Sequence, residues 1–403
     1  MRILNKILLV FIGMCFFILN VNSQEDLYNR GKSELLKRSY SQAVKTFSLM
    51  VSENPEDVLA WLGKGEGYFG LKQYDQALKD FYKAQSIESN VSSFWIAKCY
   101  AMKSDPINSM KALENHMRSP YKLPEKEIVM EPAFQKIERS KEWRSFWKNE
   151  WYKPYDKQKA NAVYQLKKGN YSKAIEELSI LINQNEDDAS LYFLRSRAYK
   201  ISGEENKSLI DLNLAIKKDP VNSMYRTERA RLYKTLDRNE EAVKDYTELI
   251  ENHPDEFEAY LNRATVLLEM KKYDRALSDV NFYLQYFENS HEAQYFAGEI
   301  CYEAGKYHDA VKYLNEALNL NQGNEEYFIV RGNIYSKMNT LEQAIDDYSM
   351  ALDLDPNNPE IYFNRGIARL KSNDSSNACY DFKKAFKMGK KEALEYLQRH
   401  CNY

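Results

Sequence analysis

Apolar and small residues recur along Glu325–Pro356 with the period of an α-helix, in two runs separated by a polar turn. Small residues, Gly332 and Ala344, stand where the two helices would approach each other, and Tyr348 supplies bulk beside them. Pro356 ends the second run, because proline lacks the N–H donor that a helix needs. The stretch therefore predicts a hairpin of two amphipathic helices.

The same pattern recurs along the chain every 34 residues. If Gly332 is position 8 of a unit, position 8 is also small at Ala162, Ser196, Ala230, Ala264, Gly298 and Gly366. Position 20 is small as well, at Ala174, Ser208, Ala242, Ala276, Ala310, Ala344 and Ala378. Because one register holds without an insertion, we predict seven contiguous units over residues 155–388.

This pattern resembles the tetratricopeptide repeat, a helix–turn–helix unit of 34 residues. The resemblance implies an all-α fold, an α–α superhelix (TPR solenoid) in which each repeat is covered by its neighbours. Residues 24–118 carry a second block of repeats in its own register, about two and a half to three units long. We therefore expect a solenoid in two blocks.

Residues 119–154 interrupt the array with a proline-rich break and an aromatic segment. Pro120, Pro124 and Pro132 exclude one continuous helix in the first part of this segment. The aromatic residues that follow share one helical face, at Trp143, Phe146, Trp147 and Trp151. We interpret this face as a plug over the end of the third unit; the alternative is a hinge or partner-binding surface between two arrays.

The C-terminal residues 389–403 contain one more amphipathic segment, which we interpret as a capping helix. Both this ending and the interruption at residues 119–154 resemble those of secreted tetratricopeptide repeat proteins of Bacteroidetes.

Residues 1–23 have the pattern of a signal peptide. Arg2 and Lys6 precede an apolar run at 7–19, and short residues follow at 21–23. An uncleaved anchor is the alternative, but the run is shorter than the roughly 20 residues that span a bilayer. We expect the mature chain to start near Gln24 and to be exported, to the periplasm or as a secreted or envelope-associated protein. No later stretch is long and apolar enough for a transmembrane segment.

The composition argues against several classes of function. The formal net charge of -2 provides no overall positive field that would attract nucleic acid. The five histidines and the cysteines show neither HExxH nor CxxC spacing, so no metal site is predicted. No group of residues indicates a catalytic site or a bound cofactor. We therefore expect a protein that is not an enzyme.

A basic residue at position 7 recurs together with an acidic residue at position 23. Both are absent from the unit that contains Gly298, which has Ala297 and Tyr313 instead. Their joint presence and joint loss indicate structural pairs between the two helices of a unit. The predicted pairs are Lys64–Asp80, Arg195–Asp211, Arg229–Asp245, Arg263–Asp279, Arg331–Asp347 and Arg365–Asp381.

Two cysteines near the C-terminus, Cys379 and Cys401, stand on either side of Gly389. If the helices around this glycine fold back antiparallel, both cysteines lie at a similar height and a disulfide is geometrically feasible. Two unpaired thiols are the alternative. Cys99 and Cys301 occupy positions that are expected in the core.

Repeats of this family usually bind a protein or peptide on the concave face, through positions 2, 5, 9, 12 and 13 of the first helix. Carried over to this sequence, these positions predict an earlier, basic part and a later part rich in glutamate and tyrosine. The partner-binding residues expected in the earlier part are Phe193, Arg197, Lys200, Arg231 and Lys234. Those expected in the later part are Tyr295, Glu299, Tyr302 and Glu303. The alternative is that these positions are charged only because they are solvated.

The sequence thus predicts a non-enzymatic scaffold that binds a protein or peptide partner on the concave surface of the repeats. We expect it in an envelope or secreted complex. The alternative is a carbohydrate- or cell-wall-associated protein that binds through exposed aromatic residues such as Trp147 and Trp151.

Overall fold

A computed structural model describes residues 24–401, and every regular element in this range is a helix. The predicted all-α fold is therefore confirmed. None of the helices in this range is long and apolar enough to span a bilayer. Residues 24–36 are helical, and the N-terminal block continues with α2 (Tyr40–Glu53), α3 (Val58–Gly70), α4 (Tyr74–Ile87), α5 (Ser93–Met102) and α6 (Pro106–Met117). The break contains α7 (Glu125–Val129), a 3₁₀ helix η1 (Pro132–Lys136) and α8 (Lys141–Phe146).

The second block runs from α9 to α22, and α23 follows it. Its helices, in chain order, are α9 (Pro154–Lys167), α10 (Tyr171–Gln184), α11 (Ala189–Ile201), α12 (Glu205–Lys218), α13 (Ser223–Thr235), α14 (Asn239–Asn252), α15 (Phe257–Glu269), α16 (Tyr273–Tyr286), α17 (His291–Glu303), α18 (Tyr307–Leu320), α19 (Glu325–Lys337), α20 (Leu341–Leu354), α21 (Pro359–Lys371), α22 (Ser375–Lys387) and α23 (Ala393–His400).

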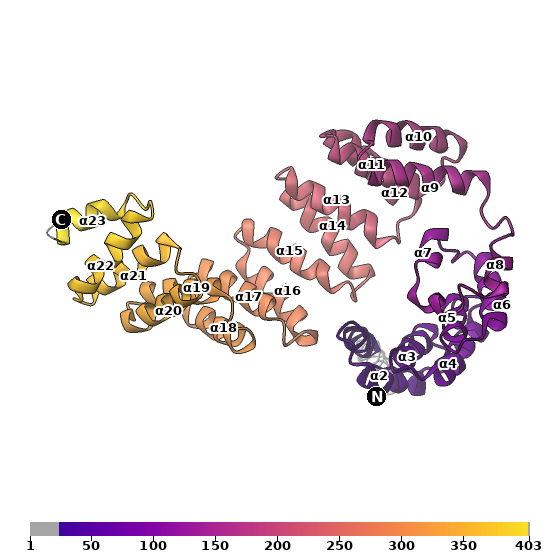
Figure 1. Ribbon diagram of the computed structural model, residues 1–403, viewed down its shortest axis with the longest axis horizontal. Coiled ribbons are helices and arrows are strands. Elements are labelled where there is room, and N and C mark those ends of the chain that lie inside the picture. The colour runs from indigo at the N-terminus through magenta and orange to yellow at the C-terminus, as the bar shows by residue number, and fades with distance from the viewer. Residues whose placement is uncertain (1–23, 402–403) are drawn as a thin grey trace, which may run out of the picture. The chain divides into compact units, whose positions relative to one another are not determined.

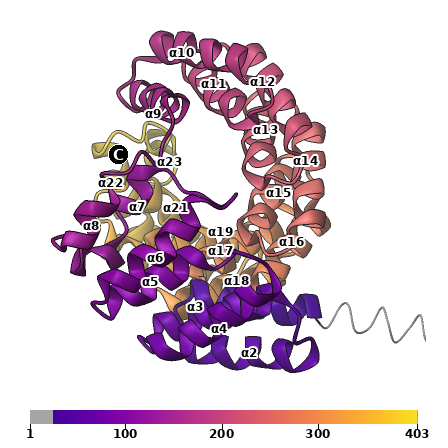
Figure 2. The same ribbon diagram turned by 90° about the vertical axis from the view of Figure 1, so that its right-hand side faces the viewer.

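The described residues form two compact units. The first contains the residues up to Leu232 together with Asn252–Asp255, and the second contains Tyr233–Glu251 and the residues from Glu256 onward. In the first unit, α11 packs against both α10 and α12, as Figure 2 shows. In the second unit, α17 packs against α18, α19 against α20 and α21 against α22 (Figure 1). Each unit is therefore a stack of helix pairs.

A left-handed backbone residue stands at position 15, between the two helices of each repeat in the second block. Gly169, Gly203 and Gly305 adopt this conformation, with φ of 82°, 75° and 72°. Glycine has no Cβ, so it reaches positive φ without steric cost. Other residue types take the same conformation at the equivalent position, at Asp237, Lys271, Asn339 and Asn373. The turn is therefore set by the register of the repeat and not by glycine alone.

The small residues at position 8 allow the two helices of a repeat to come close together. A Cβ atom at Gly332 would lie 2.9 Å from Cε1 of Tyr348, and one at Gly366 would lie 2.7 Å from Cε1 of Phe382. Tyr348 and Phe382 are both buried, so neither ring can move away into solvent. The glycines therefore provide the space that the aromatic residues of the second helix fill.

An arginine–aspartate pair ties the two helices of most repeats together. In Arg263–Asp279 the Nε and Nη2 atoms donate to the two carboxylate oxygens at 2.8 and 2.7 Å. The same bidentate geometry occurs in Arg195–Asp211, Arg331–Asp347 and Arg365–Asp381. The four aspartates are at most 6% exposed. The remaining predicted arginine pair, Arg229–Asp245, spans the two compact units and stays a prediction.

The same arginines also reach back to the preceding repeat, which the sequence analysis missed. Arg263 Nη1 donates to Thr247 Oγ1 at 3.0 Å, and Arg331 Nη1 donates to Asn315 Oδ1 at 2.6 Å. Equivalent bonds run from Arg195 to Ser179, from Arg229 to Asn213 and from Arg365 to Ser349. All these acceptors occupy position 25, which is Ser, Thr or Asn from Ser179 to Ser349. We call the arginine with its two acceptors the repeat clamp.

The unit that contains Gly298 replaces the clamp with a different bond. Its position 7 is Ala297, and its position 23 is Tyr313 instead of aspartate. The hydroxyl of Tyr313 donates to Oδ1 of Asn281, the position-25 residue of the preceding repeat, at 2.8 Å. The contact to the preceding repeat is thereby kept without a charged group.

The break at residues 119–154 covers the end of the third repeat. The 3₁₀ helix η1 packs on α5, and α8 packs on α6. The side chains of the break share one buried cluster with those of α5 and α6; this cluster includes Ile96, Leu113, Ile128, Phe134, Trp143 and Phe146. This is the packing that the plug interpretation predicts, because a repeat exposes its apolar face where no neighbour follows.

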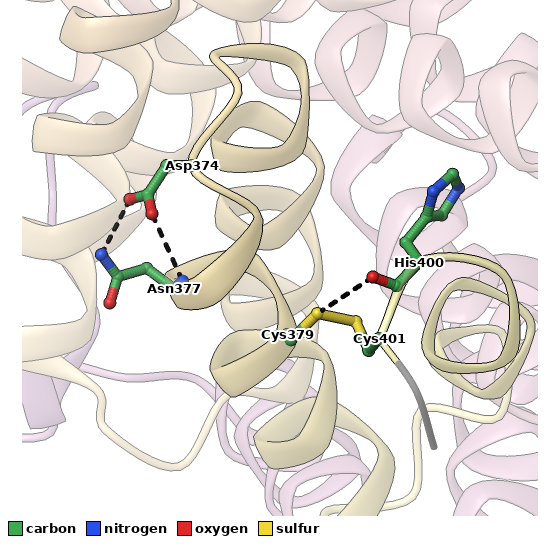
Figure 3. Close-up of a disulfide and its surroundings, with 5 residues drawn as sticks. All are labelled: Asp374, Asn377, Cys379, His400 and Cys401. Carbon is green, nitrogen blue, oxygen red and sulfur yellow. Dashed lines mark hydrogen bonds between the residues drawn. A yellow bond between two sulfur atoms is a disulfide. The ribbon is translucent and has the colours of Figure 1, made fainter.

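The last helix, α23, closes the other end of the array. Ala393 and Leu397 of α23 are fully buried in a cluster with Phe382 of α22. A disulfide joins Cys379 of α22 to Cys401, just after α23, as Figure 3 shows. The Cα atoms of the two cysteines are 5.5 Å apart. Cys99 and Cys301 are buried free thiols.

The clamp makes a prediction about stability. Arg263→Gln should lower the free energy of unfolding of the second unit by about 3 kcal/mol, because Asp279 would remain buried without its cation. Urea unfolding, combined with hydrogen exchange of α15 and α16, measures the effect.

Two further variants test the cause of this loss. Arg238→Gln removes an exposed arginine, paired with Glu241 at 2.7 Å, and should cost less than about 1 kcal/mol. Arg263→Ala combined with Asp279→Tyr copies the uncharged bond of Tyr313 and should recover part of the stability. Equal losses for Arg263→Gln and Arg238→Gln would contradict the structural role of the clamp.

The disulfide makes a second prediction. Its sequence separation is 22 residues, and a crosslink that closes a loop of this size stabilises the folded state by about 3 kcal/mol. Reduction should therefore increase hydrogen exchange in α23 while α19 and α20 stay protected. In the variant Cys379→Ala with Cys401→Ala, the reductant should have no further effect; any further loss of protection would show that reduction acts elsewhere.

Candidate partner-binding groove

Phe193, one of the predicted partner-binding residues, does not face a groove. Its side chain is 7% exposed, and its ring centroid lies 5.0 Å from that of Tyr225 on α13. The following repeat covers it, so the prediction that Phe193 contacts a partner is wrong. A repeat position that faces a groove in the family pattern is here covered by a side chain of the next repeat, Tyr225.

The predicted basic side chains are partly neutralised by glutamates. Lys200 lies 3.7 Å from Glu228, and Lys234 lies 3.0 Å from Glu269. The other two predicted residues, Arg197 and Arg231, are exposed on α11 and α13. The earlier repeats therefore carry exposed arginines, whereas the predicted lysines are each paired with a glutamate.

The predicted residues of the later part come together on α17. Tyr295 stacks on Tyr327 of α19, with ring centroids 4.8 Å apart, and its hydroxyl donates to Oε1 of Glu299 at 3.0 Å. One helical turn further on, Tyr302 is half-buried and Glu303 is exposed. Tyr295 thus holds Glu299 in place, and the next turn carries an aromatic ring and a second carboxylate.

Three of these residues line a cleft of about 390 Å³ in the second unit. Its walls come from the first helices of three consecutive repeats, α15, α17 and α19, and from the turn after α15. Its lining residues are Leu268, Glu269, Lys271, Tyr273, Glu299, Tyr302, Glu303, Val330 and Asn333. We call this set the acidic cleft, because three of its side chains are acidic and one is basic.

The sequence predicts Glu299, Tyr302 and Glu303 as partner-binding residues, but it does not indicate other residues that line the acidic cleft. Lys271 and Tyr273 belong to the turn and the start of α16, and Val330 occupies position 6 of its repeat. None of these positions is among the five that the family pattern indicates. Only the stacking of one repeat on the next brings them to the same cleft.

Burial and charge shift the ionisation of the acidic cleft. Burial raises the pKa of Glu299 above its usual range, and the nearby carboxylates of Glu326 and Glu303 raise it further. The hydrogen bond from Tyr295 acts in the opposite direction. Burial and the Glu299 carboxylate also raise the pKa of Tyr295, so its hydroxyl remains protonated and donates. An incoming cation would stabilise the ionised form of Glu299.

The aromatic residues proposed for carbohydrate binding are used within the protein. Trp151 stacks on Phe146, with centroids 4.7 Å apart, and its Nε1 donates to the Phe146 carbonyl at 2.7 Å. Trp147 packs edge-on against Trp143 and Phe146 in the same cluster. Both tryptophans are half-buried in the plug, so the structure does not favour a sugar-binding platform there.

Across residues 24–401, no group of three or more histidine, cysteine or acidic side chains is arranged to hold a metal ion. Two polar side chains of the acidic cleft, Glu299 and Asn333, accept hydrogen bonds from tyrosine hydroxyls of the protein. The Tyr348 hydroxyl donates to Oδ1 of Asn333 at 2.7 Å, which orients this amide at the wall of the cleft. These two bonds hold Glu299 and Asn333 in fixed orientations at the cleft.

Comparison with other proteins identifies the repeats. A family model described as tetratricopeptide repeat matches residues 227–281 and 261–325, and one described as TPR repeat matches residues 332–373. Proteins of this family are generally non-enzymatic scaffolds. No curated protein matches the chain.

Solved structures share the architecture at low sequence identity. The C-terminal part of a TPR repeat-containing protein from Cytophaga hutchinsonii is 14% identical, with a TM-score of 0.53; the match covers 59% of this chain and 98% of that one. A tetratricopeptide repeat protein from Parabacteroides merdae is 22% identical, with a TM-score of 0.45; the match covers 60% of this chain and 97% of that one. The family models show that residues 227–325 and 332–373 are tetratricopeptide repeats, and the Cytophaga hutchinsonii structure shares their helical fold.

Proposed function

We propose that the protein is a scaffold that binds a segment of another protein in the acidic cleft between α15, α17 and α19. Tetratricopeptide repeats are protein-interaction modules, which supports the general role. The observation that carries the proposal is the cleft itself, because its lining combines apolar and charged side chains. Binding sites that orient a ligand commonly have this combination of surfaces.

The structure of α17 supports a site that is formed before the partner arrives. Tyr295 is fixed by stacking on Tyr327 and by its hydrogen bond to Glu299. Side chains that are already held in place lose less conformational freedom on binding, which favours affinity. An extended segment lying across three first helices would contact three repeats at once.

We also propose that the protein acts outside the cytoplasm, in an envelope or secreted complex. The signal-peptide pattern lies in residues 1–23, outside the described residues, and supports this proposal through its sequence alone. The disulfide between Cys379 and Cys401 is compatible with an oxidising compartment.

The compartment is tested on the protein purified from its native host. Its mature N-terminus should lie near Gln24, and Cys379 and Cys401 should resist thiol labelling until a reductant is added. Intact-mass measurement before and after labelling gives both results. An intact N-terminus in the cytoplasmic fraction would contradict export.

The binding site is tested by site-specific photocrosslinking. A benzophenone amino acid in place of Glu303, at the exposed rim of the cleft, should give protein adducts in envelope extracts. The matched control carries the same group in place of Glu316, an exposed residue of α18 that does not line the cleft. Adding Tyr302→Ala should reduce the adducts at position 303, because it removes an aromatic wall. Equal labelling at both positions would rule out the cleft as the binding site.

A further inference from the structure

We infer that the acidic cleft receives an arginine or lysine side chain of an extended partner segment. This inference rests on the proposed function and specifies the chemistry of its partner. It follows from the charge of the lining, from the apolar surface beside that charge, and from the way Glu299 is held.

The lining has an excess of negative charge. Its acidic residues are Glu269, Glu299 and Glu303, and its single basic residue is Lys271. Lys234 lies 3.0 Å from Glu269 and offsets the charge of that residue. The two carboxylates of α17 therefore outnumber the remaining cation, Lys271. Charge complementarity between a site and its ligand favours the matching partner and excludes ligands of like charge.

The unit that supplies two of these carboxylates has no clamp. In most repeats an arginine at position 7 belongs to the first helix, whereas α17 has Ala297 there. The net charge is unchanged by this loss, because Tyr313 replaces the aspartate partner at position 23 as well. The repeat that lost the clamp is the one that supplies Glu299, Tyr302 and Glu303 to the cleft.

The apolar part of the lining matches the shape of a basic side chain. Arginine and lysine have a long aliphatic stem and a charged end. Leu268 and Val330 provide aliphatic surface in the cleft, and Tyr302 provides a half-buried ring. An arginine or lysine head group is also attracted to the face of an aromatic ring. An acidic side chain would be repelled by the carboxylates of this lining, and a purely apolar one would contact only its apolar residues.

Glu299 is oriented for such a contact. The Tyr295 hydroxyl binds Oε1, and a carboxylate has acceptor sites on both oxygens. The partly desolvated carboxylate is costly to ionise without a neighbouring cation, and a guanidinium or ammonium group would remove this cost. A charge-assisted hydrogen bond from a basic side chain would use the free acceptor sites of Glu299 and would supply the neighbouring cation.

Three labelled peptides of equal length test this inference. Each is an extended glycine- and serine-rich segment with two variable positions, which are arginine, glutamine or glutamate. Fluorescence anisotropy measures their binding to the full mature chain. The arginine peptide should bind most tightly, and added salt should weaken its binding because the contact is ionic.

Matched variants locate the contact. Glu299→Gln with Glu303→Gln should weaken arginine-peptide binding by about tenfold or more, equal to about 1.4 kcal/mol. Glutamine keeps an acceptor for Tyr295, so the fold of α17 should be preserved; circular dichroism checks this. The control, Glu316→Gln with Glu342→Gln, removes the same charge at exposed positions of α18 and α20 and should leave affinity unchanged.

The outcomes separate this inference from the proposed function. If the arginine peptide binds no better than the glutamine peptide, or if the cleft variant binds it unchanged, the basic partner is wrong. If the glutamine or glutamate peptide binds instead and Tyr302→Ala abolishes its binding, the cleft is a binding site for another chemistry. If no peptide binds and crosslinking is equal at positions 303 and 316, the proposed function fails as well.

Discussion

The repeat clamp connects three helices through one partly buried cation. Arg263 of α15 binds Asp279 of the same repeat and Thr247 of the preceding one. A carboxylate that is 6% exposed is stable there only because the guanidinium satisfies both of its oxygens. In a linear array each repeat is stabilised by its neighbours, so a bond that joins two repeats adds to the interface on which the fold depends.

The repeat that lacks the clamp is also the one that supplies Glu299, Tyr302 and Glu303 to the acidic cleft. In the repeat of α17 and α18, Tyr313 keeps the contact to Asn281 with a neutral hydroxyl. This repeat can therefore dispense with its arginine and still pack on its neighbour. The same helix supplies two glutamates and a tyrosine to the lining of the acidic cleft. The change in the structural pattern and the residues proposed to bind a partner thus occur in one unit.

The apolar surface at the end of each repeat block is covered in a different way. A repeat without a neighbour exposes apolar surface, which must be covered. After the third repeat, the aromatic side chains of η1 and α8 cover it, and Trp147 and Trp151 serve this packing. After the last repeat, α23 covers it and is crosslinked to α22 by the disulfide. Trp147 and Trp151, which looked available in the sequence, are therefore half-buried against the core.

The sequence by itself determined the helix pairs, their register and most of the arginine–aspartate pairs, because these depend on spacings of fewer than 34 residues that repeat along the chain. It also pointed to Glu299, Tyr302 and Glu303, which share one helical face. It did not separate buried Phe193 from exposed Arg197, since burial there depends on Tyr225 of the following repeat. The ion pairs of Lys200 and Lys234, and the inclusion of Lys271 and Val330 in the cleft, were decided by the tertiary structure. The physical reason is that the stacking of one repeat on another sets the distances between their side chains, and no local pattern contains those distances.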